Sequence, residues 1–318
     1  MRRIVAGVVV AAMLLVTAAC GSEDDKPDTV GGGTRIGLGV IPIVDVAPVY
    51  LGKQMGFFSS RGIDLDLVQE QGGAAIVKGV LDGKYQFGFS NVTSLMAATA
   101  GGAPLKVVAN GVASTGRAGR DFSAIVVRYG SPVRTPADLE GKRIAVNTLK
   151  NLGDTTVRQS VRKAGGDPTK LKFQAMPFPE MPEALQSGAI DAAWVVEPQL
   201  SQAITLGAQV LASNLVDTAP DLTVAAYFTG SPLIADNPDL VKRFTDAVNE
   251  SLRYAAGHPD EVRAVVGTYT QISETVRLMM ILPNWPSDIN RSSLEVLSRL
   301  GQSDGIFPGP PALEQLLP

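Results

Sequence analysis

Few side chains in this sequence are of the types that act as nucleophiles or bind metals. The 318 residues include one cysteine, Cys20, and one histidine, His258. These two cannot form a disulfide or a Cys/His zinc cage, so no metal and no cofactor are expected. Acid–base chemistry would depend on carboxylates such as Asp45 and Glu197. We therefore expect no catalytic residues and a protein that binds rather than transforms a small molecule.

The side chains that could bind such a molecule stand where predicted strands end or predicted helices begin. Ligands of open α/β sheets bind outside the carboxyl ends of the strands, often at the junction of two domains. Gly72 and Gly73 would let a ligand approach a helix N-terminus, where free N–H groups favour an anionic or carbonyl-like group. The residues predicted to bind substrate are Ile43, Asp45, Gly72, Gly73, Ser90, Asn91, Thr148, Asn151 and Glu197.

Two of these side chains could instead stabilise helix ends, and two nearby arginines are further candidates for binding. Asp45 could cap the helix predicted at 47–55, and Glu197 could stabilise the helix that starts at Pro198. Arg117 and Arg120 lie on a glycine-bearing loop and could reach an anion, although exposed loop arginines are usually solvated. The ligand's charge stays open, because helix ends favour an anion whereas Asp45 and Glu197 together favour donors such as a pyrimidine amine.

The elements that must position these residues occur twice along the chain. Strands are predicted at 35–40, 65–68, 86–89 and 105–109 in the first copy, and at 143–146, 171–174, 191–196 and 209–212 in the second. Helices are predicted between them. The glycines that punctuate the two copies keep a constant offset, since Gly62 and Gly166 are 104 residues apart and Gly83 and Gly188 are 105 apart.

This repeat predicts an α/β fold of two lobes, each a mostly parallel sheet flanked by helices. We expect lobe I to comprise 34–126 and 227–318, and lobe II to comprise 127–226. Two crossings, near Val126–Val127 and Ala225–Ala226, would form a hinge. The helices predicted after Asn237 have no sheet of their own, so we expect them to pack on lobe I.

The first residues read as a secretion signal followed by a tether. Arg2 and Arg3 precede an apolar run at 4–16, which is too short to span a bilayer, and small residues follow at 17–19. Residues 1–19 are therefore a predicted signal peptide. Cys20 comes next, and 20–33 is polar and glycine-rich, as in a flexible tether.

Size and charge restrict the class of protein further. A chain of 318 residues with 45% hydrophobic content is sufficient for about two domains with real cores. Its 28 basic and 31 acidic residues give a net charge of −3, so no overall positive field attracts phosphate backbones. We expect no nucleic-acid partner.

Several motifs, in order over both lobes, resemble one branch of the substrate-binding proteins of ABC importers, the branch for sulfonates, nitrate and thiamine precursors. They are APVYLGKQMGFF at 47–58, Gly62–Ile63–Asp64, DLEGKRIAV at 138–146 and Glu197–Pro198. The resemblance implies a two-lobed periplasmic-binding-protein-like fold of type II that closes on a small solute and passes it to a permease. The junction at Cys20 resembles the lipobox of bacterial lipoproteins, with Thr17 where leucine is commonest, which implies lipidation of Cys20.

The sequence thus indicates a monomeric, lipid-anchored solute-binding protein on the extracytoplasmic face of a bacterial cell membrane, with an ABC permease as its partner. Its ligand would be a small organic or oxyanionic nutrient of the sulfonate, nitrate-like or thiamine-pyrimidine class. One alternative is an enzyme, since a thiamine-pyrimidine synthase shares this branch, but that enzyme uses histidine- and cysteine-rich motifs. A second alternative is a solute-sensing lipoprotein, which neighbouring genes would distinguish.

Overall fold

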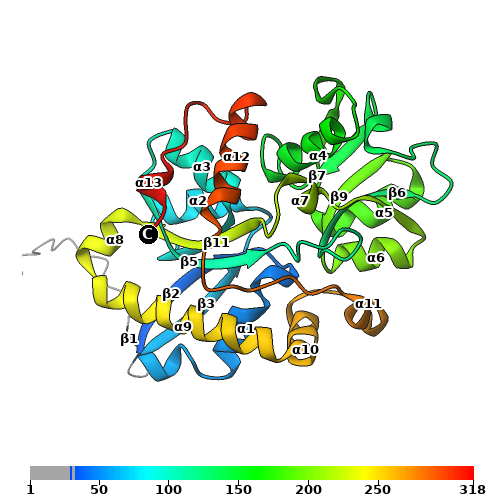
Figure 1. Ribbon diagram of the computed structural model, residues 1–318. Coiled ribbons are helices and arrows are strands. Elements are labelled where there is room, and N and C mark those ends of the chain that lie inside the picture. The colour runs from blue at the N-terminus through cyan, green and yellow to red at the C-terminus, as the bar shows by residue number, and fades with distance from the viewer. Residues whose placement is uncertain (1–28, 31–32) are drawn as a thin grey trace, which may run out of the picture.

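The computed structural model describes residues 29–30 and 33–318, which form two lobes, each built on one mixed sheet (Figure 1). The predicted signal peptide and Cys20, with most of the tether, lie outside the described residues. Within the described part, no helix combines the length and apolar character needed to cross a membrane.

The first sheet has six strands, and its order is β3-β2-β4-β11-β5, with β1 paired to the start of β2. Strands β3, β2 and β4 are parallel, whereas β11 runs antiparallel to both of its neighbours. The strands are β1 (Thr29–Val30), β2 (Gly33–Val40), β3 (Ile63–Gln69), β4 (Phe87–Asn91), β5 (Leu105–Ala113) and β11 (Thr223–Gly230).

The second sheet repeats this plan with five strands in the order β8-β7-β9-β6-β10. Strands β8, β7 and β9 are parallel, and β6 is antiparallel to β9 and β10. The strands are β6 (Ser123–Arg128), β7 (Arg143–Val146), β8 (Lys172–Ala175), β9 (Ala192–Val196) and β10 (Ala208–Ala212). In each lobe, the antiparallel inner strand is therefore the one that follows a crossing.

The strand pairing shows that the chain crosses between the lobes at other residues than predicted. Val126 and Val127 lie inside β6 of the second sheet, and Ala225 and Ala226 lie inside β11 of the first. The chain instead crosses at 114–122 and 219–222, ahead of each inserted strand. Both strands are buried and apolar, so their sequences do not distinguish a crossing from a sheet interior.

Helices between successive strands cover the sheets, and their apolar residues form the two cores. In lobe I, the buried rings of Phe87 and Phe244 stack 3.7 Å apart between β4 and helix α9. The helices of the repeat are α1 (Ala47–Gln54), α2 (Gly73–Leu81), α3 (Val92–Ala100), α4 (Leu152–Lys163), α5 (Met181–Ser187), α6 (Gln199–Thr205) and α7 (Asn214–Thr218); five short 3-10 helices join them, η1 (Val44–Val46), η2 (Ser59–Arg61), η3 (Pro136–Leu139), η4 (Pro168–Lys170) and η5 (Phe178–Glu180).

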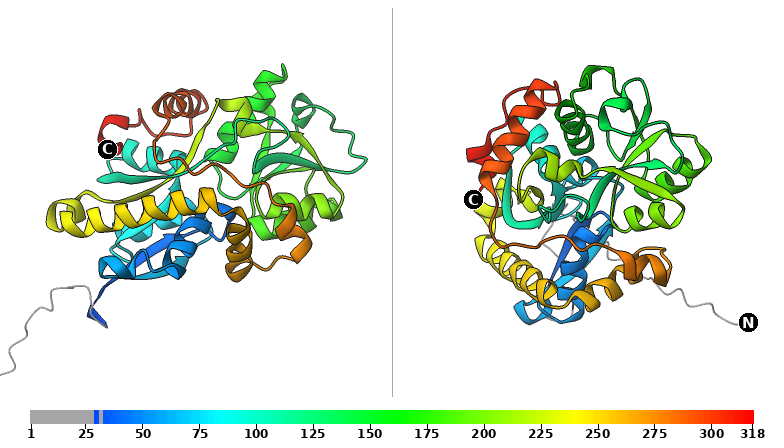
Figure 2. Two further views of the ribbon diagram at one scale, coloured as in Figure 1. Left: turned by 60° about the horizontal axis from the view of Figure 1, so that its bottom comes forward. Right: turned by 45° about the vertical axis from the view of Figure 1, so that its right-hand side comes forward.

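The sequence predicted that the C-terminal helices pack on the first lobe. In the structure, not all of them do. Helices α9 and α10 lie on α1, but α11 contacts α6 of the second lobe, and α12 contacts both α3 and α4. In Figures 1 and 2, the segment after α11 runs back along the junction of the lobes to α12, so 280–290 is a third connection. The helices are α8 (Ser231–Asp236), α9 (Pro238–Gly257), α10 (Pro259–Tyr269), α11 (Glu274–Met279), α12 (Arg291–Ser303) and α13 (Leu313–Leu316).

Candidate functional site

The two lobes touch one another where the strands of both sheets end. The Val44 N–H of lobe I donates to the Glu197 carbonyl oxygen of lobe II over 3.1 Å. Farther along, the Asn151 Nδ2 of lobe II donates to Ser94 Oγ of lobe I over 2.8 Å. Both contacts join the lobes directly, so the structure represents a closed arrangement of the cleft.

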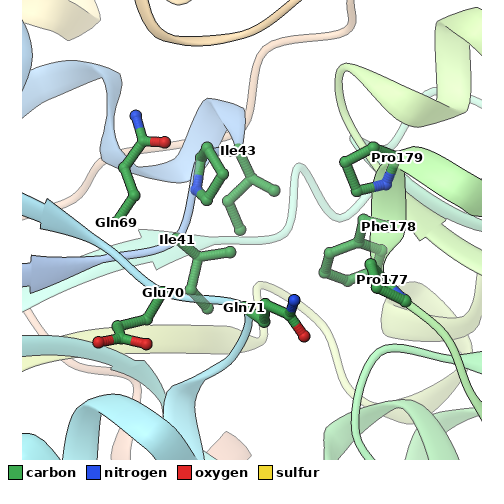
Figure 3. Close-up of a pocket in the computed structure, with 9 residues that line it drawn as sticks. Ile41, Ile43, Gln69, Glu70, Gln71, Pro177, Phe178 and Pro179 are labelled. Carbon is green, nitrogen blue, oxygen red and sulfur yellow. The ribbon is translucent and has the colours of Figure 1, made fainter.

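A pocket of about 280 Å³ opens between the lobes beside these contacts (Figure 3). Ile41 and Ile43 face Phe178 and Pro179 across it, and its wall is mostly apolar. Glu70 stands at its edge, where its carboxylate accepts from Lys84 Nζ over 2.7 Å and from Tyr85 Oη. Of the predicted binding residues, Ile43 lines this pocket.

The segment 177–179 was missed in the sequence, although the repeat contains the signal that could have found it. It follows β8 and precedes α5, in the same way that Gly72 follows β3 and Gly73 begins α2. With the offset of 105 residues between the copies, Pro177 and Phe178 are at the positions of the repeat equivalent to those glycines. Their different residue types hide the equivalence.

The absence of side chains at Gly72 and Gly73 permits close packing at the mouth of the cleft. A Cβ atom at Gly73 would lie 2.1 Å from Ser90 Oγ, and one at Gly72 would lie 2.8 Å from Thr148 Oγ1 in the other lobe. A side chain at either position would push these groups apart. The structure thus brings Gly72 and Thr148 together across the two lobes, whereas Gly73 packs against Ser90 within lobe I.

Asn91 and Asn151 are helix caps. Asn91 Oδ1 accepts from the Ser94 N–H over 2.9 Å at the start of α3, and Asn151 Oδ1 accepts from the Leu152 N–H over 2.8 Å at the start of α4. Ser90 is fully buried beside Asn91. Asn151 also makes the bond between the lobes through its other amide atom, so capping and closure depend on the same side chain.

Asp45 is buried in η1, between β2 and α1, and caps no helix. Helix α1 begins after Val46 without any side-chain cap, so the predicted alternative of a capping role for Asp45 is wrong. Burial, with a smaller contribution from the charge of Asp121, raises the pKa of Asp45 from 3.8 to about 7. Within the described part of the chain, Asp45 Oδ1 and Tyr227 Oη are both buried without a hydrogen-bond partner.

Glu197 is fully buried, and other protein groups donate hydrogen bonds to its carboxylate. Its oxygens accept from the Ser201 N–H, the Ser201 Oγ and the Ile281 N–H, over 2.9 to 3.0 Å. Burial raises its pKa to about 7, while these bonds and Arg263 oppose the rise. Glu197 and Asn91, both predicted to bind substrate, are thus buried and hydrogen-bonded within the protein.

Three more polar atoms are buried without partners, among the described residues, just beyond strand ends. Asn147 follows β7, Thr93 lies in the first turn of α3 after β4, and Gln199 begins α6 after β9. With Asp45 after β2, they come from both lobes. Buried polar groups normally have partners, so such atoms at a cleft are candidates to bind a ligand. Each of the three lies within two residues of a binding residue predicted from the sequence.

Metal binding has no comparable basis, since no group of three or more His, Cys, Asp or Glu side chains in the described ranges is placed to hold an ion.

The fold and the closed cleft between two α/β lobes define a periplasmic-binding-protein-like class. The ligand-binding component of an ABC-type import system from Staphylococcus aureus superposes with a TM-score of 0.77 at 16% identity, covering 89% of this chain and 96% of that one. The periplasmic aliphatic sulphonate binding protein SsuA from Escherichia coli gives 0.71 at 18% identity, covering 90% and 92%. These likenesses confirm the predicted fold.

Residues 43–262 match the family described as NMT1/THI5 like, and this chain belongs to that family. One relative, 23% identical over 241 residues, is the 4-amino-5-hydroxymethyl-2-methylpyrimidine phosphate synthase of Candida albicans; the match covers 72% of this chain and 68% of that protein. The predicted family is confirmed, and it contains proteins named for binding as well as one named for synthesis.

Proposed function

We propose that this protein is the solute-binding component of an ABC importer, which captures a small organic molecule between its lobes and delivers it to a permease without changing it. The main observation behind this proposal is the cleft between the lobes. Direct hydrogen bonds join the two lobes there, and nearby polar atoms just beyond the strand ends are buried without a partner in the described part of the chain. The names of the S. aureus and E. coli neighbours support the same role.

The walls of the cleft favour an organic ligand over a simple inorganic oxyanion. Ile41, Ile43 and Phe178 offer apolar surface, which nitrate cannot cover. Asp45 Oδ1 is a buried acceptor, and a ligand N–H or O–H would satisfy it. Of the three nutrient classes, a pyrimidine precursor with an amino group fits both features, and a sulfonate fits only the first.

A thermal-shift panel tests this function. The purified protein is melted with 4-amino-5-hydroxymethyl-2-methylpyrimidine, an alkanesulfonate or nitrate at equal concentration. A ligand at 100 times its Kd should stabilise the fold by about 2.7 kcal/mol. Stabilisation by the pyrimidine supports the proposal, and stabilisation by the sulfonate alone overturns the ligand class. If none of the three stabilises the protein, the proposed function fails.

An enzymatic role is the second candidate, because one relative is named as a synthase. Asp45 and Glu197 both have a pKa raised to about 7, which is suitable for acid–base work. The Glu197 carboxylate already accepts three hydrogen bonds from protein donors, whereas Asp45 Oδ1 has no partner in the described part of the chain. Recovery of a bound ligand unchanged after prolonged incubation supports binding, and any turnover product supports catalysis.

Closure should depend on the hydrogen bond between Ser94 and Asn151. Ser94→Ala leaves the Asn91 cap intact, since that bond uses the Ser94 backbone, but it strands the Asn151 Nδ2 in the closed state. A stranded buried donor costs about 1–3 kcal/mol, so affinity should fall roughly 5- to 150-fold, measured by calorimetric titration. Thr99→Ala is the control, because it removes a hydroxyl that bonds only within α3. Equal affinities in both variants would contradict a closing role for Ser94.

Anchoring through Cys20 is part of the proposal and rests on the sequence. Cys20→Ser should release the protein from membranes or leave it unprocessed, since each buried CH₂ of an acyl chain contributes about 0.8 kcal/mol to membrane binding. Membrane fractionation with intact-mass measurement checks this. A variant with unchanged mature mass and location would show that Cys20 carries no lipid.

A further inference from the structure

A second cavity, of about 570 Å³, lies at the hinge among residues that the proposed function leaves unused. It is bounded by the first crossing, by the third connection and by helix α10. Its lining includes Thr115, Arg117, Arg120, Arg263, Ile281 and Asn284. The volume falls in the range of small-molecule sites, about 300–1,000 Å³.

The charged residues that line this cavity are all basic. Three of its lining residues are arginines, and none of the described residues that line it is acidic. Arg117 and Arg120 are exposed and form no ion pair with any described residue. The hinge cavity therefore carries three guanidinium groups in its lining, and the two carboxylates near them, Asp260 and the buried Glu197, both lie beside Arg263 and outside the lining.

Hydrogen bonds hold the Arg263 side chain in place, but one nitrogen of its guanidinium has no partner among the described residues. Its terminal nitrogens donate to the carbonyl oxygens of Pro259 and Met280 over 3.3 Å, and the exposed Asp260 carboxylate lies 3.8 Å away. Its Nε is buried and has no partner in the described part of the chain. The terminal nitrogens meet only two neutral carbonyl oxygens at 3.3 Å, so Arg263 adds a largely unneutralised positive charge to the wall of the cavity.

The loop that carries the other two arginines is ordered by its own hydrogen bonds. Thr115 Oγ1 donates to the Arg120 carbonyl over 2.8 Å, and the Asp121 carboxylate accepts from Ser114 Oγ and the Thr115 N–H. The Gly119 N–H donates to Ser213 Oγ of the second lobe over 2.8 Å. The base of the loop is thus preorganised, and only two flexible side chains need to converge on a ligand.

We propose that the hinge cavity binds a small multivalent oxyanion, carrying phosphate or carboxylate groups, between Arg117, Arg120 and Arg263. Guanidinium groups bind such oxygens through paired, charge-assisted hydrogen bonds. The first two arginines belong to one connection between the lobes, and Arg263 touches the start of another at Met280. A bound anion would join these connections at a site separate from the apolar cleft.

Calorimetric titration of the protein without cleft ligand tests the site, so its result is independent of the proposed function. Inorganic pyrophosphate and citrate are the two probes, at constant ionic strength of about 0.15 M. The wild type should bind at least one of them at a single site, and the stronger probe identifies phosphate or carboxylate chemistry. Arg117→Ala/Arg120→Ala should weaken that binding at least tenfold.

Arg253→Ala/Arg299→Ala is the matched control, because it removes the same charge from exposed positions outside the cavity. The affinity of this control variant for the anion should stay within twofold of that of the wild type. Equal weakening in both double variants would mean that overall charge, rather than this site, attracts the anion, and absence of binding to the wild type would equally overturn the proposal. Circular dichroism melts of both variants verify that the exposed substitutions leave the fold intact.

Discussion

Replacing Glu197 by alanine is expected to destabilise the fold by on the order of 3 kcal/mol. The carboxylate accepts three hydrogen bonds, two of them from the backbone N–H groups of Ser201 and Ile281. Each buried donor left without a partner costs about 1–3 kcal/mol. Ile281 belongs to the third connection between the lobes, so the loss also frees that segment from the start of α6.

Chemical denaturation of the ligand-free protein at about pH 5 measures this effect, because above that pH the raised pKa of Glu197 makes its ionised form cost stability in the wild type. Glu183→Ala is the matched control, since Glu183 is an exposed acidic residue in the first turn of another second-lobe helix. Its unfolding free energy should stay within about 0.5 kcal/mol of the wild type. If Glu197→Ala were as stable as the control, and only its affinity fell, Glu197 would be a ligand residue and its hydrogen bonds would be dispensable.

Much of the fold was accessible from the sequence because it is built twice. The strand predicted at 143–146 has the observed bounds of β7, and the helix predicted at 47–55 ends one residue beyond α1. Each predicted strand of the repeat has a counterpart in the other lobe, so one copy supports the interpretation of the other. The periodicity of apolar residues then assigns the element type.

The connections between the lobes were not accessible in the same way. β6 and β11 insert antiparallel between strands that the repeat predicts to be neighbours, and their apolar residues are compatible with any central position of either sheet. Helix α11 is only six residues long and contacts both α10 of the first lobe and α6 of the second. Short segments carry little pattern, so their partners are decided by tertiary packing.

The binding site stays a prediction, but the structure shows where its residues lie. Ile43, Gly72, Thr148 and Asn151 are at the junction of the lobes, where the strand ends led us to expect them. Burial of individual carboxylates is a property of the assembled core. The sequence therefore could not show that Glu197 is saturated by protein donors whereas Asp45 retains a free oxygen.

Asp45→Asn is expected to stabilise the protein at pH 8 by on the order of 4 kcal/mol and to leave stability at pH 4 nearly unchanged. Burial raises the pKa of Asp45 from 3.8 to about 7 in the folded state. Between these values the folded chain holds a proton that the unfolded chain has released, so the wild type loses stability as pH rises from about 4 to 7. Asparagine removes this titration.

The measurement is the difference in unfolding free energy between Asp45→Asn and wild type across pH 4 to 8. Glu197 and Asp154, whose pKa values are raised to about 7 and about 6, titrate with the same sign, so the variant keeps part of the slope and only the difference isolates Asp45. Asp260→Asn, at a fully exposed carboxylate, is the control and should give a flat difference. A flat difference for Asp45→Asn as well would show that the carboxyl group is not desolvated.

The same variant links stability to the cleft. A carboxylate that destabilises its own fold at neutral pH, with one oxygen buried and unpartnered, is typical of a side chain that serves a ligand rather than the core. Asp45→Asn should therefore gain stability and lose affinity for a donor-bearing ligand, because an amide oxygen is a weaker acceptor than a carboxylate. A gain in stability with unchanged affinity would place Asp45 outside the binding site and leave Asn147, Thr93 and Gln199 as the polar groups of the cleft.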